Sequence, residues 1–484
     1  MTQITYLDFY TILPVSILIV WACALLLVDL FIPKGRKGLT ALLAAVGLAL
    51  TMGISLTQLG GSASGFHAMV VLDGFSNFLN ILFLLTGLLS VAVAYGYLNR
   101  MGLEHSEYYV IMLFSISGMM LMSQATDLII TFLALELLSI PLYVLAAFAY
   151  PRVASEEAGI KYFLLGAYAT GFVVYGIALT FGATGTTSFA GIVAAIKAGS
   201  ASPQMLLIGA ALILIGFGFK IAAVPFHMWT PDVYQGAPTS VTAFMAAGAK
   251  AAGFAAILRI FATVFPSLAA DLMPVMAVLS ALTMIVGNVL AIAQTDIKRM
   301  LAYSSIAQAG YILMAFVPFA NASTRLVSVS AGLFYLVAYT LTSFGSWGVV
   351  IALEKAEGEG LSIADYAGLW KKYPWLAAAM AVFMLSLTGL PPTLGLIGKI
   401  YLFRAVLEGG VTWLALVGVI TSLISAYYYL RVIIIMYMKD GDPQVTRETW
   451  LEIAIGACAV LTVVFSFIPQ TLFAWASQAV LSLF

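Results

Sequence analysis

Five charged side chains stand inside long apolar stretches of a 484-residue chain in which only 9% of the residues are charged. Glu136 is the one carboxylate among them, and the other four are Lys220, Lys250, Lys399 and Arg431. An ionisable group near the middle of a bilayer costs about 2.5–3.5 kcal/mol on insertion scales, so such groups often mark ion or proton pathways. Burial strips water from an ammonium and favours the neutral amine, which can then exchange protons with a nearby carboxylate or water. The pattern predicts proton translocation along Glu136, Lys220, Lys250 and Lys399.

Glu136 is the expected modulator of Lys220, because a carboxylate beside the lysine would hold its charge and withdrawal of the carboxylate would release the proton. His227, Tyr429 and Arg431 are further candidates for a relay. An imidazole titrates near neutral pH, but His227 could equally be a loop residue bonded to the backbone. Arg431 could equally be structural, since it lies about two turns from a loop.

Lys220 and Lys399 both lie in stretches rich in glycine and proline, LILIGFGFKIAAVPFHMW and LSLTGLPPTLGLIGKIYLF. Both helices should therefore be broken, and broken backbone is tolerated at membrane depth only where it lines a cavity or is buried in protein. The two lysines are 179 residues and five predicted spans apart. An odd number of crossings inverts a repeat relative to its copy, so the spacing predicts two inverted five-helix repeats. The same shift carries Glu136 to Ala315 and Lys250 to Tyr429.

Fourteen apolar stretches are long enough to cross a membrane, for which about 20 residues are needed. They cover residues 9–31, 38–60, 74–97, 108–124, 127–149, 159–182, 204–224, 238–262, 271–294, 300–320, 327–353, 375–405, 410–438 and 450–470. We therefore predict an all-α, polytopic membrane protein of about 14 transmembrane helices. Residues 1–107 would form three N-terminal transmembrane helices, 108–262 the first repeat, 263–438 the inverted second repeat, and 439–484 a C-terminal transmembrane helix and tail. Each repeat would supply one proton half-channel.

Lysine and arginine in the connections indicate the orientation, because loops rich in them stay in the cytoplasm. Thirteen lie in the odd-numbered connections, Lys298 among them, whereas Lys197, Arg259, Arg325 and Arg404 lie in the others. With an even number of spans, both termini should face away from the cytoplasm.

Several classes of site and partner are excluded by composition. The 21 basic and 21 acidic residues cancel, so no basic surface is available for nucleic acid. Cys23 and Cys458 stand far apart in apolar runs, and the three histidines are equally scattered, so neither a disulfide framework nor a metal, haem or iron–sulfur site is expected. Any electron transfer should therefore take place in another chain.

Three long motifs resemble one known family. They are FKIAAVPFHMWTPDVYQGAPTSVTAFMAAGAKAAGF, TDIKRMLAYSSIAQAGYIL and LSLTGLPPTLGLIGKIYLF. They are similar to the antiporter-like membrane subunits of the proton-pumping NADH-quinone oxidoreductase, respiratory complex I, most strongly over residues 108–438. A lysine rather than a glutamate at 399 and the short C-terminal end make the chain most similar to the subunit N branch.

The resemblance implies a role for each charged residue. Glu136 corresponds to the family's span-five glutamate, Lys220 and Lys399 to the lysines of its broken helices, and Lys250 to its span-eight lysine. It also implies a proton-translocating subunit of a translocase in the bacterial inner membrane. FMN, iron–sulfur clusters and quinone would be bound by other subunits. The partners would be other membrane-arm subunits, including homologous ones, together with lipids, protons and internal water.

Two other functions are compatible with parts of the sequence. The D-type subunit of multi-subunit sodium/proton antiporters has a similar length, a lysine at the position of Lys399 and a motif similar to QGAPTSV. A self-contained quinone-binding enzyme is disfavoured, because such a site needs convergent polar groups near the cofactor that reduces the quinone.

Overall fold

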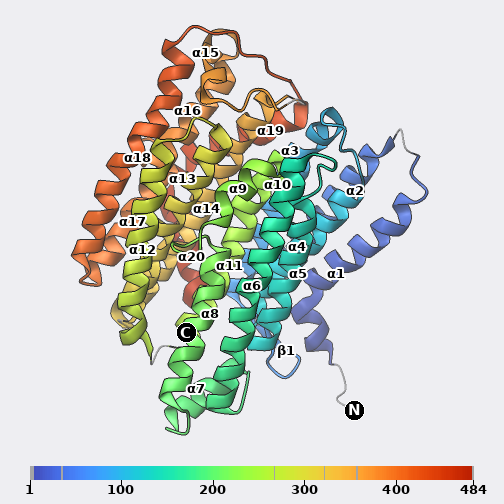
Figure 1. Ribbon diagram of the computed structural model, residues 1–484. Helices are drawn as coiled ribbons and strands as arrows, with labels where there is room; N and C mark the ends of the chain where they lie inside the picture. The colour runs from blue at the N-terminus through green and yellow to red at the C-terminus, as the bar shows by residue number, and fades with distance from the viewer. Residues whose placement is uncertain (1–4, 34–35, 266–267, 321, 356–357, 482–484) are drawn as a thin grey trace.

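Long apolar helices running between two ends of the molecule make up nearly all of the structure (Figure 1). This computed structural model describes residues 5–33, 36–265, 268–320, 322–355 and 358–481. The bilayer core offers no water to backbone N–H and C=O groups, so a chain of this composition satisfies them within helices. The predicted all-α, polytopic class is confirmed.

The elements follow one another with short connections. In chain order they are α1 (Tyr6–Asp29), α2 (Gly38–Thr57), β1 (Ala63–Gly65), β2 (Val70–Leu72), α3 (Gly74–Arg100), α4 (Glu107–Gln124), α5 (Leu128–Ala146), α6 (Val153–Thr184), α7 (Phe189–Lys197), α8 (Pro203–Lys220), α9 (Trp229–Gly236), α10 (Thr239–Phe244), the π-helix η2 (Met245–Ala249), α11 (Lys250–Thr263), α12 (Ala269–Ile292), α13 (Ile297–Leu313), the 3₁₀ helix η4 (Met314–Ala320), α14 (Ala322–Leu353), the 3₁₀ helix η5 (Ile363–Tyr366), α15 (Leu369–Lys372), α16 (Pro374–Thr388), α17 (Leu394–Glu408), α18 (Thr412–Met438), α19 (Thr449–Phe467) and α20 (Pro469–Leu481). The two strands form an antiparallel hairpin.

Twelve helical stretches in the described part of the chain are long and apolar enough to cross a membrane. Two of the fourteen predicted spans are not among them. The stretch 108–124 is α4, whose ends carry Glu107 and Gln124. The stretch 375–405 is divided between α16 and α17, each 15 residues long. The count of 14 therefore stays a prediction.

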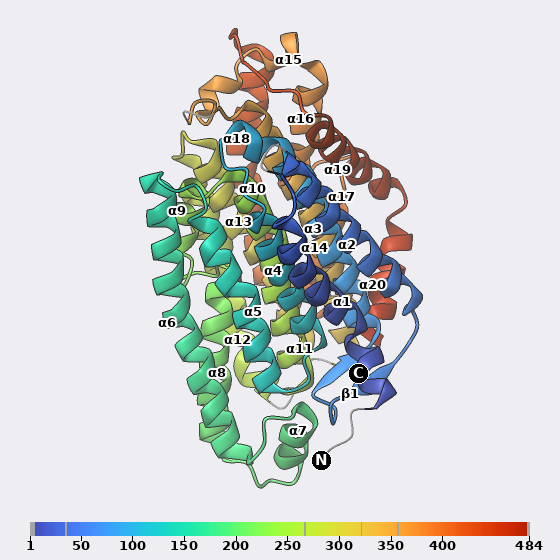
Figure 2. The same cartoon turned by 90° about the vertical axis from the view of Figure 1, so that its right-hand side faces the viewer.

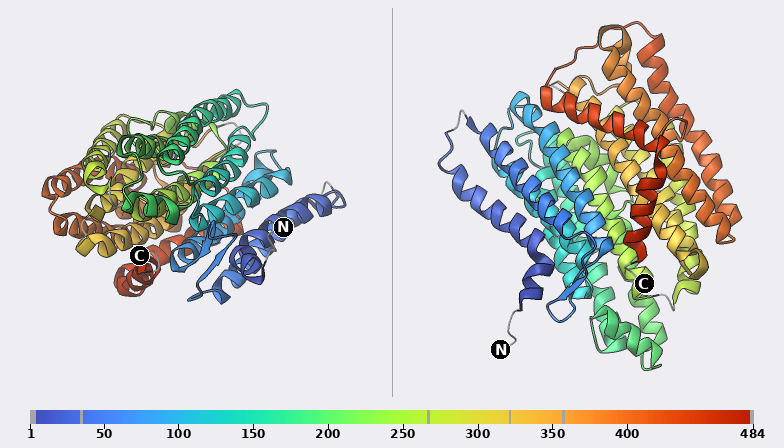
Figure 3. Two further views of the ribbon diagram at one scale, coloured as in Figure 1. Left: turned by 90° about the horizontal axis from the view of Figure 1, so that it is seen from below. Right: turned by 180° about the vertical axis from the view of Figure 1, so that it is seen from behind.

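Three stretches at the centre of the bundle are almost completely covered by other helices. The stretch α10–η2–α11 and helix α14 are fully buried, and α13 is nearly so, whereas α1, α6, α18 and α19 each expose a broad apolar face. The C-terminal helices α19 and α20 both contact α3 and α14, so they bind the N-terminal helices to the second half of the chain (Figure 3). The central helices thus lie at the greatest distance from lipid, where charged groups can be surrounded by protein.

One structural motif occurs twice, at opposite ends of the molecule. Asp127 and Ser188 form an isolated antiparallel bridge, and so do Asp296 and Ser362. In each case the aspartate caps the following helix, α5 or α13. The first bridge lies beside α7 and the second leads into η5 near α15, and Figure 2 shows α7 and α15 at opposite ends. An identical motif on opposite faces is what an inverted repeat produces.

These bridges also fix which residues correspond in the two halves. Counting nine residues from each capping aspartate, Glu136 corresponds to Ser305. The uniform shift of 179 residues that pairs Glu136 with Ala315 is wrong, because the offset is 169 residues at the two aspartates and grows to 179 only at Lys220 and Lys399. Connections of different length between the helices change the offset along the chain.

Candidate functional site

Lys220 is the last residue of α8, at the break expected for the seventh span. The next residues form turns, Ala222 has a φ of 61°, and regular helix resumes at Trp229. The ammonium donates hydrogen bonds to Ser139 Oγ at 2.8 Å and to the Tyr162 hydroxyl at 3.1 Å. The negative end of the α8 dipole also lies beside this charge and stabilises it.

Glu136 lies one helical turn from Ser139 on α5. Its Oε1 accepts a hydrogen bond of 2.9 Å from Thr170, and its side chain lines an open groove of about 520 Å³ between α5 and α6. Glu136 and Lys220 interact electrostatically, but the ammonium bonds directly to two hydroxyl groups. The two charges are therefore neighbours linked through α5, without the direct contact that the sequence interpretation placed between them.

Lys250 begins α11 directly after the π-helix Met245–Ala249. A π-turn shifts the hydrogen-bond register of a helix, and such turns occur frequently at functional sites. The Lys250 ammonium donates to the Ser305 carbonyl at 2.6 Å and also to the Ser305 hydroxyl. Nothing in the residue pattern predicted this π-turn, because small apolar residues fit an ordinary α-helix equally well.

A glycine brings the helix of Lys250 against Lys220. A Cβ added to Gly253 would lie 3.3 Å from Lys220 Cγ. Residues three positions apart lie on the same side of an α-helix, so Lys250 lies about one turn along α11 from the point where Gly253 meets the stem of Lys220. Lys220 is thus packed against α11, the helix that begins with Lys250.

A chain of polar contacts leads from Lys250 to Lys399. Next to Ser305, which binds Lys250, the Ser304 hydroxyl shares a hydrogen bond of 2.5 Å with the Tyr429 hydroxyl. Gln308 Nε2 donates to that hydroxyl at 3.2 Å and to the Leu387 carbonyl at 3.0 Å. The same carbonyl accepts a hydrogen bond of 3.1 Å from the Lys399 ammonium.

Lys399 closes the break expected in the twelfth span. Helix α16 ends at Thr388, and Gly389 follows with a φ of 87°. From α17, the Lys399 ammonium reaches back to the Thr388 carbonyl at 2.9 Å and to Ser422 Oγ at 3.1 Å, and it lies 4.3 Å from the centre of the Tyr311 ring. The last carbonyls of a helix have no partner within it, so the ammonium satisfies them.

The three weaker candidates have different surroundings. Tyr429 is fully buried and lies on the polar chain between two lysines. Arg431 donates to the Ile292 and Gln294 carbonyls at 3.1 and 2.5 Å, which anchors α18 to the end of α12 and favours the structural interpretation. His227 is buried in the turn after α8, and its Nδ1 has no protein partner among the described residues. Relay roles for all three stay predictions.

Four buried charged residues were missed by the sequence analysis. Arg259 and Lys298 were placed in connections, but their side chains lie inside the protein, where Arg259 pairs with Asp73 and Lys298 donates to the Ala237 carbonyl at 2.8 Å. Glu354 is also buried, and accepts a bond of 3.5 Å from a tyrosine hydroxyl. All four lie close to the ends of predicted spans, where composition does not distinguish a buried side chain from one in water.

Comparison with known proteins places this arrangement in a family. Residues 125–425 match the profile described as NADH:quinone oxidoreductase/Mrp antiporter, transmembrane. The chain belongs to this family. A relative from Trichlorobacter lovleyi, "NADH-quinone oxidoreductase subunit N", is 49% identical over 97% of this chain and 96% of its own length. A subunit N from Chloroflexus aggregans is 46% identical, with 98% of both chains covered.

Solved structures of this NADH:quinone oxidoreductase/Mrp antiporter family share the fold. A chain of respiratory complex I from Thermus thermophilus is 34% identical, with a TM-score of 0.82 over 96% of this chain and 99% of that one. A chain of the Mrp complex from Dietzia has a TM-score of 0.87 over 99% and 98% of the two chains, at 21% identity. The fold is thus common to both complexes, whereas the sequence is closer to the complex I chain.

Proposed function

We propose that the chain is subunit N of a bacterial NADH-quinone oxidoreductase and that it moves protons along Glu136, Lys220, Lys250 and Lys399. The observation that carries the proposal is the row of polar groups between Lys250 and Lys399. Lys250 bonds to Ser305, and hydrogen bonds lead from its chain neighbour Ser304 through Tyr429 and Gln308 to the Leu387 carbonyl that Lys399 binds. Side chains that can gain and lose protons, placed in a row near helix breaks that other helices cover, are suited to proton transfer. They offer no redox chemistry. The identities of 46–49% to named subunit N proteins over nearly the whole chain support the same assignment.

Each lysine amine takes up a proton from one side and passes it to the next group through hydroxyls and internal water. Ser139 and Tyr162 hold the Lys220 ammonium in place at the helix break. Glu136 acts on this charge from the groove between α5 and α6, which faces outward from the bundle. A neighbouring membrane-arm subunit bound there would change the position or hydration of the carboxylate and so switch the charge of Lys220.

The inverted five-helix repeats, over residues 108–262 and 263–438, supply the two half-channels. The paired Asp127–Ser188 and Asp296–Ser362 bridges support this division. The proposed boundaries coincide with the ends of helices, since α11 ends at Thr263 and α18 at Met438. The charge distribution of the connections supports an orientation with both termini outside the cytoplasm.

Electron transfer belongs to other subunits in this proposal. FMN, the iron–sulfur clusters and the quinone are bound there, and none of them is assigned to this chain. The enzyme activity is that of the whole translocase, in which quinone reduction drives proton movement through the membrane arm.

The test uses the intact complex reconstituted into proteoliposomes, with Lys220→Met and Lys399→Met as separate variants. We expect each variant to assemble and to lose most NADH-driven proton uptake together with NADH oxidation, because the two are tightly coupled. Lys197→Met, on the exposed surface of α7, is the matched control and should behave as the unmodified complex. Normal proton uptake in both lysine variants would refute the proposal. Unaffected respiration with a sodium-dependent growth defect would instead indicate the D-type antiporter subunit.

A further inference from the structure

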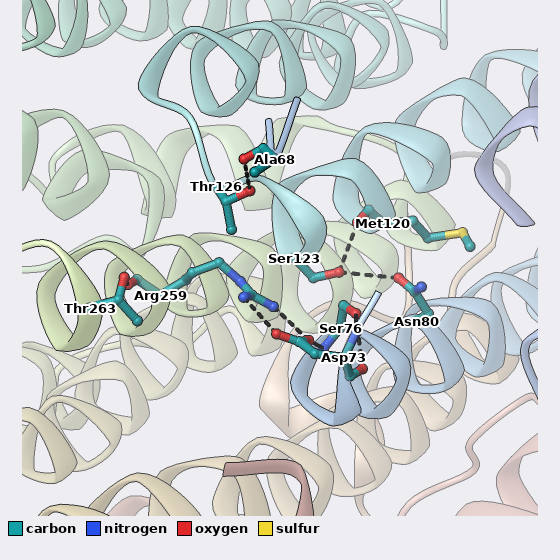
Figure 4. Close-up of polar contacts among 9 residues, drawn as sticks. All are labelled: Ala68, Asp73, Ser76, Asn80, Met120, Ser123, Thr126, Arg259 and Thr263. Atoms are coloured by element: carbon teal, nitrogen blue, oxygen red, sulfur yellow. Dashed lines mark hydrogen bonds and ion pairs between the residues drawn. The ribbon is translucent and has the colours of Figure 1, made fainter. Parts of the chain in front are cut away.

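A second cluster of charged and polar side chains is buried where the N-terminal helices meet α4 and α11 (Figure 4). At its centre Arg259 of α11 binds Asp73, the residue that caps α3, through two parallel hydrogen bonds of 2.8 Å. The side chains of the pair are only 4% and 6% exposed. This outer ion pair lies beside the β1–β2 hairpin, at the end of the molecule where both termini are found (Figure 1).

Amides and hydroxyls of α3, α4 and the end of α2 lie in the same region as the outer ion pair. Asn80 of α3 accepts a hydrogen bond of 3.1 Å from Ser123 of α4 (Figure 4). Asn77 donates to the Gln58 carbonyl at the end of α2 at 2.8 Å, and Gln124 donates to a carbonyl of α1 at 3.2 Å. All of these side chains are at most 1% exposed. We call Gln58, Asp73, Asn77, Asn80, Ser123, Gln124 and Arg259 the outer polar cluster.

Many polar atoms of the outer polar cluster have no protein partner. Among the described residues they are Gln58 Oε1, Asn77 Oδ1, Asn80 Nδ2, Gln124 Oε1 and Arg259 Nε. A buried polar atom without a partner loses its hydration without compensation, so such atoms are normally satisfied by protein or by ordered water. One of them belongs to the ion pair and the other four to the amides of the same cluster, which points to internal water, because such water typically forms about three hydrogen bonds to groups of this kind.

The outer polar cluster is joined to the lysine row by two helices. Arg259 is nine residues beyond Lys250 on α11, which corresponds to about 13 Å along the helix axis. On α3, Thr86 lies six residues beyond Asn80, and its hydroxyl would be 3.2 Å from a Cβ added to Gly248 in the π-turn. Both helices therefore lead from the surroundings of Lys250 to the outer ion pair.

We propose that the outer polar cluster holds a group of internal water molecules and that Asp73 is the last proton acceptor on the route from Lys250 to the outer side. The water carries a proton to the Asp73 carboxylate, which becomes a neutral carboxylic acid and weakens its bond to Arg259. Loss of the proton to outer water restores the carboxylate and the ion pair. This inference rests on the proposed function, since it assigns an exit to the same row of lysines.

The experiment compares Asp73→Asn and Asp73→Glu in the reconstituted complex with Lys250→Met in the same preparation. We expect Asp73→Asn to lower NADH-driven proton uptake to the level of Lys250→Met and Asp73→Glu to retain it. Asp29→Asn removes a carboxylate paired with Lys37 outside the cluster, and it should leave proton uptake unchanged. Assembled Asp73→Asn complex that pumps normally while Lys250→Met does not would overturn this inference and leave the proposed function standing. Normal pumping in both variants would overturn both.

Two further measurements decide the case in which Asp73→Asn fails to assemble. Asn80→Leu leaves the ion pair intact and removes an amide of the cluster, so it should lower proton uptake in the assembled complex. A cryo-electron microscopy map of the unmodified complex that resolves water should show density at hydrogen-bond distance, about 3 Å, from Asn80 Nδ2 and Arg259 Nε. Normal uptake in Asn80→Leu or a dry cluster in that map would make the pair a structural anchor and refute the proposal.

Discussion

Gln308 connects the two halves of the proposed proton route, and its replacement by leucine tests that connection. The amide binds the Leu387 carbonyl at 3.0 Å and the Tyr429 hydroxyl at 3.2 Å, and its Oε1 accepts a hydrogen bond of 2.5 Å from Tyr335. Leucine has nearly the same size but cannot form any of these bonds. Gln308→Leu therefore removes the polar group between Lys250 and Lys399 with little change in volume.

The cost in stability follows from the partners left behind. Leu387 keeps its bond to Lys399, and Tyr429 keeps its bond to Ser304. Only the Tyr335 hydroxyl loses the partner that the structure gives it, and an unsatisfied buried hydroxyl costs about 1–3 kcal/mol. The variant should therefore assemble with a modest loss of thermal stability, which measurements of complex content and melting temperature will show.

Proton movement should be affected far more than folding. A tenfold slower transfer requires a barrier only about 1.4 kcal/mol higher, and a missing link in the polar chain exceeds this easily. We expect NADH-driven proton uptake in proteoliposomes to fall at least about tenfold in Gln308→Leu. Gln294→Leu changes a glutamine after the end of α12 whose amide donates only to the Leu290 carbonyl of that helix, and this variant should pump normally. Gln308→Leu complex that pumps at the rate of the unmodified complex would show that protons do not pass this residue.

Three other substitutions test separate parts of the site. Gly389→Ala places a Cβ 2.9 Å from Lys399 Cδ at a residue with a φ of 87°, so it should displace the amine and impair proton uptake. Gly185→Ala has a φ of 74° and no close neighbour, so it should cost about the same 1–2 kcal/mol of stability without impairing uptake. Equal uptake in the two variants would contradict this prediction. Glu136→Gln removes the charge that acts on Lys220 and should slow proton uptake in normally inserted complex. Glu157→Gln, on the exposed part of α6, should leave uptake unchanged. Unchanged pumping in Glu136→Gln would rule out the switch. Arg431→Met removes two hydrogen bonds at the end of α12, which should cost about 2 kcal/mol of stability and lower the melting temperature. The ratio of proton uptake to NADH oxidation should stay unchanged, and a lower ratio would assign Arg431 to the relay.

The positions of the helix breaks could be predicted from the sequence because their causes are local. Proline near Lys220 and Lys399 lacks a helical hydrogen-bond donor and glycine weakens a helix, and α8 and α16 end there. The odd number of crossings between the lysines indicated inversion, and the two aspartate bridges agree with it. The correspondence of Glu136 with Ser305 could not be predicted, because it depends on connection lengths that differ between the halves.

The partners of the charged residues could not be predicted from the chain alone. Ser305 and Ser139 lie 55 and 81 residues from the lysines that they bind, and Arg259 lies 186 residues from Asp73. Near the end of a span, the residue types do not show whether a charged side chain extends into water or is buried within the bundle. For this reason Arg259 was assigned to a connection, although its side chain is almost completely buried.

The amino-acid sequence determined that the protein is a helical bundle in a membrane, which side chains carry charge within it, and where its helices break. These properties follow from transfer free energy and local backbone geometry, which depend on a residue and its neighbours in the chain. The packing of distant helices alone decided that Lys250 bonds to Ser305, that Gln308 bridges to Leu387, and that Arg259 pairs with Asp73. A hydrogen bond extends only about 3 Å, so the order of a proton route exists only once the helices are in contact.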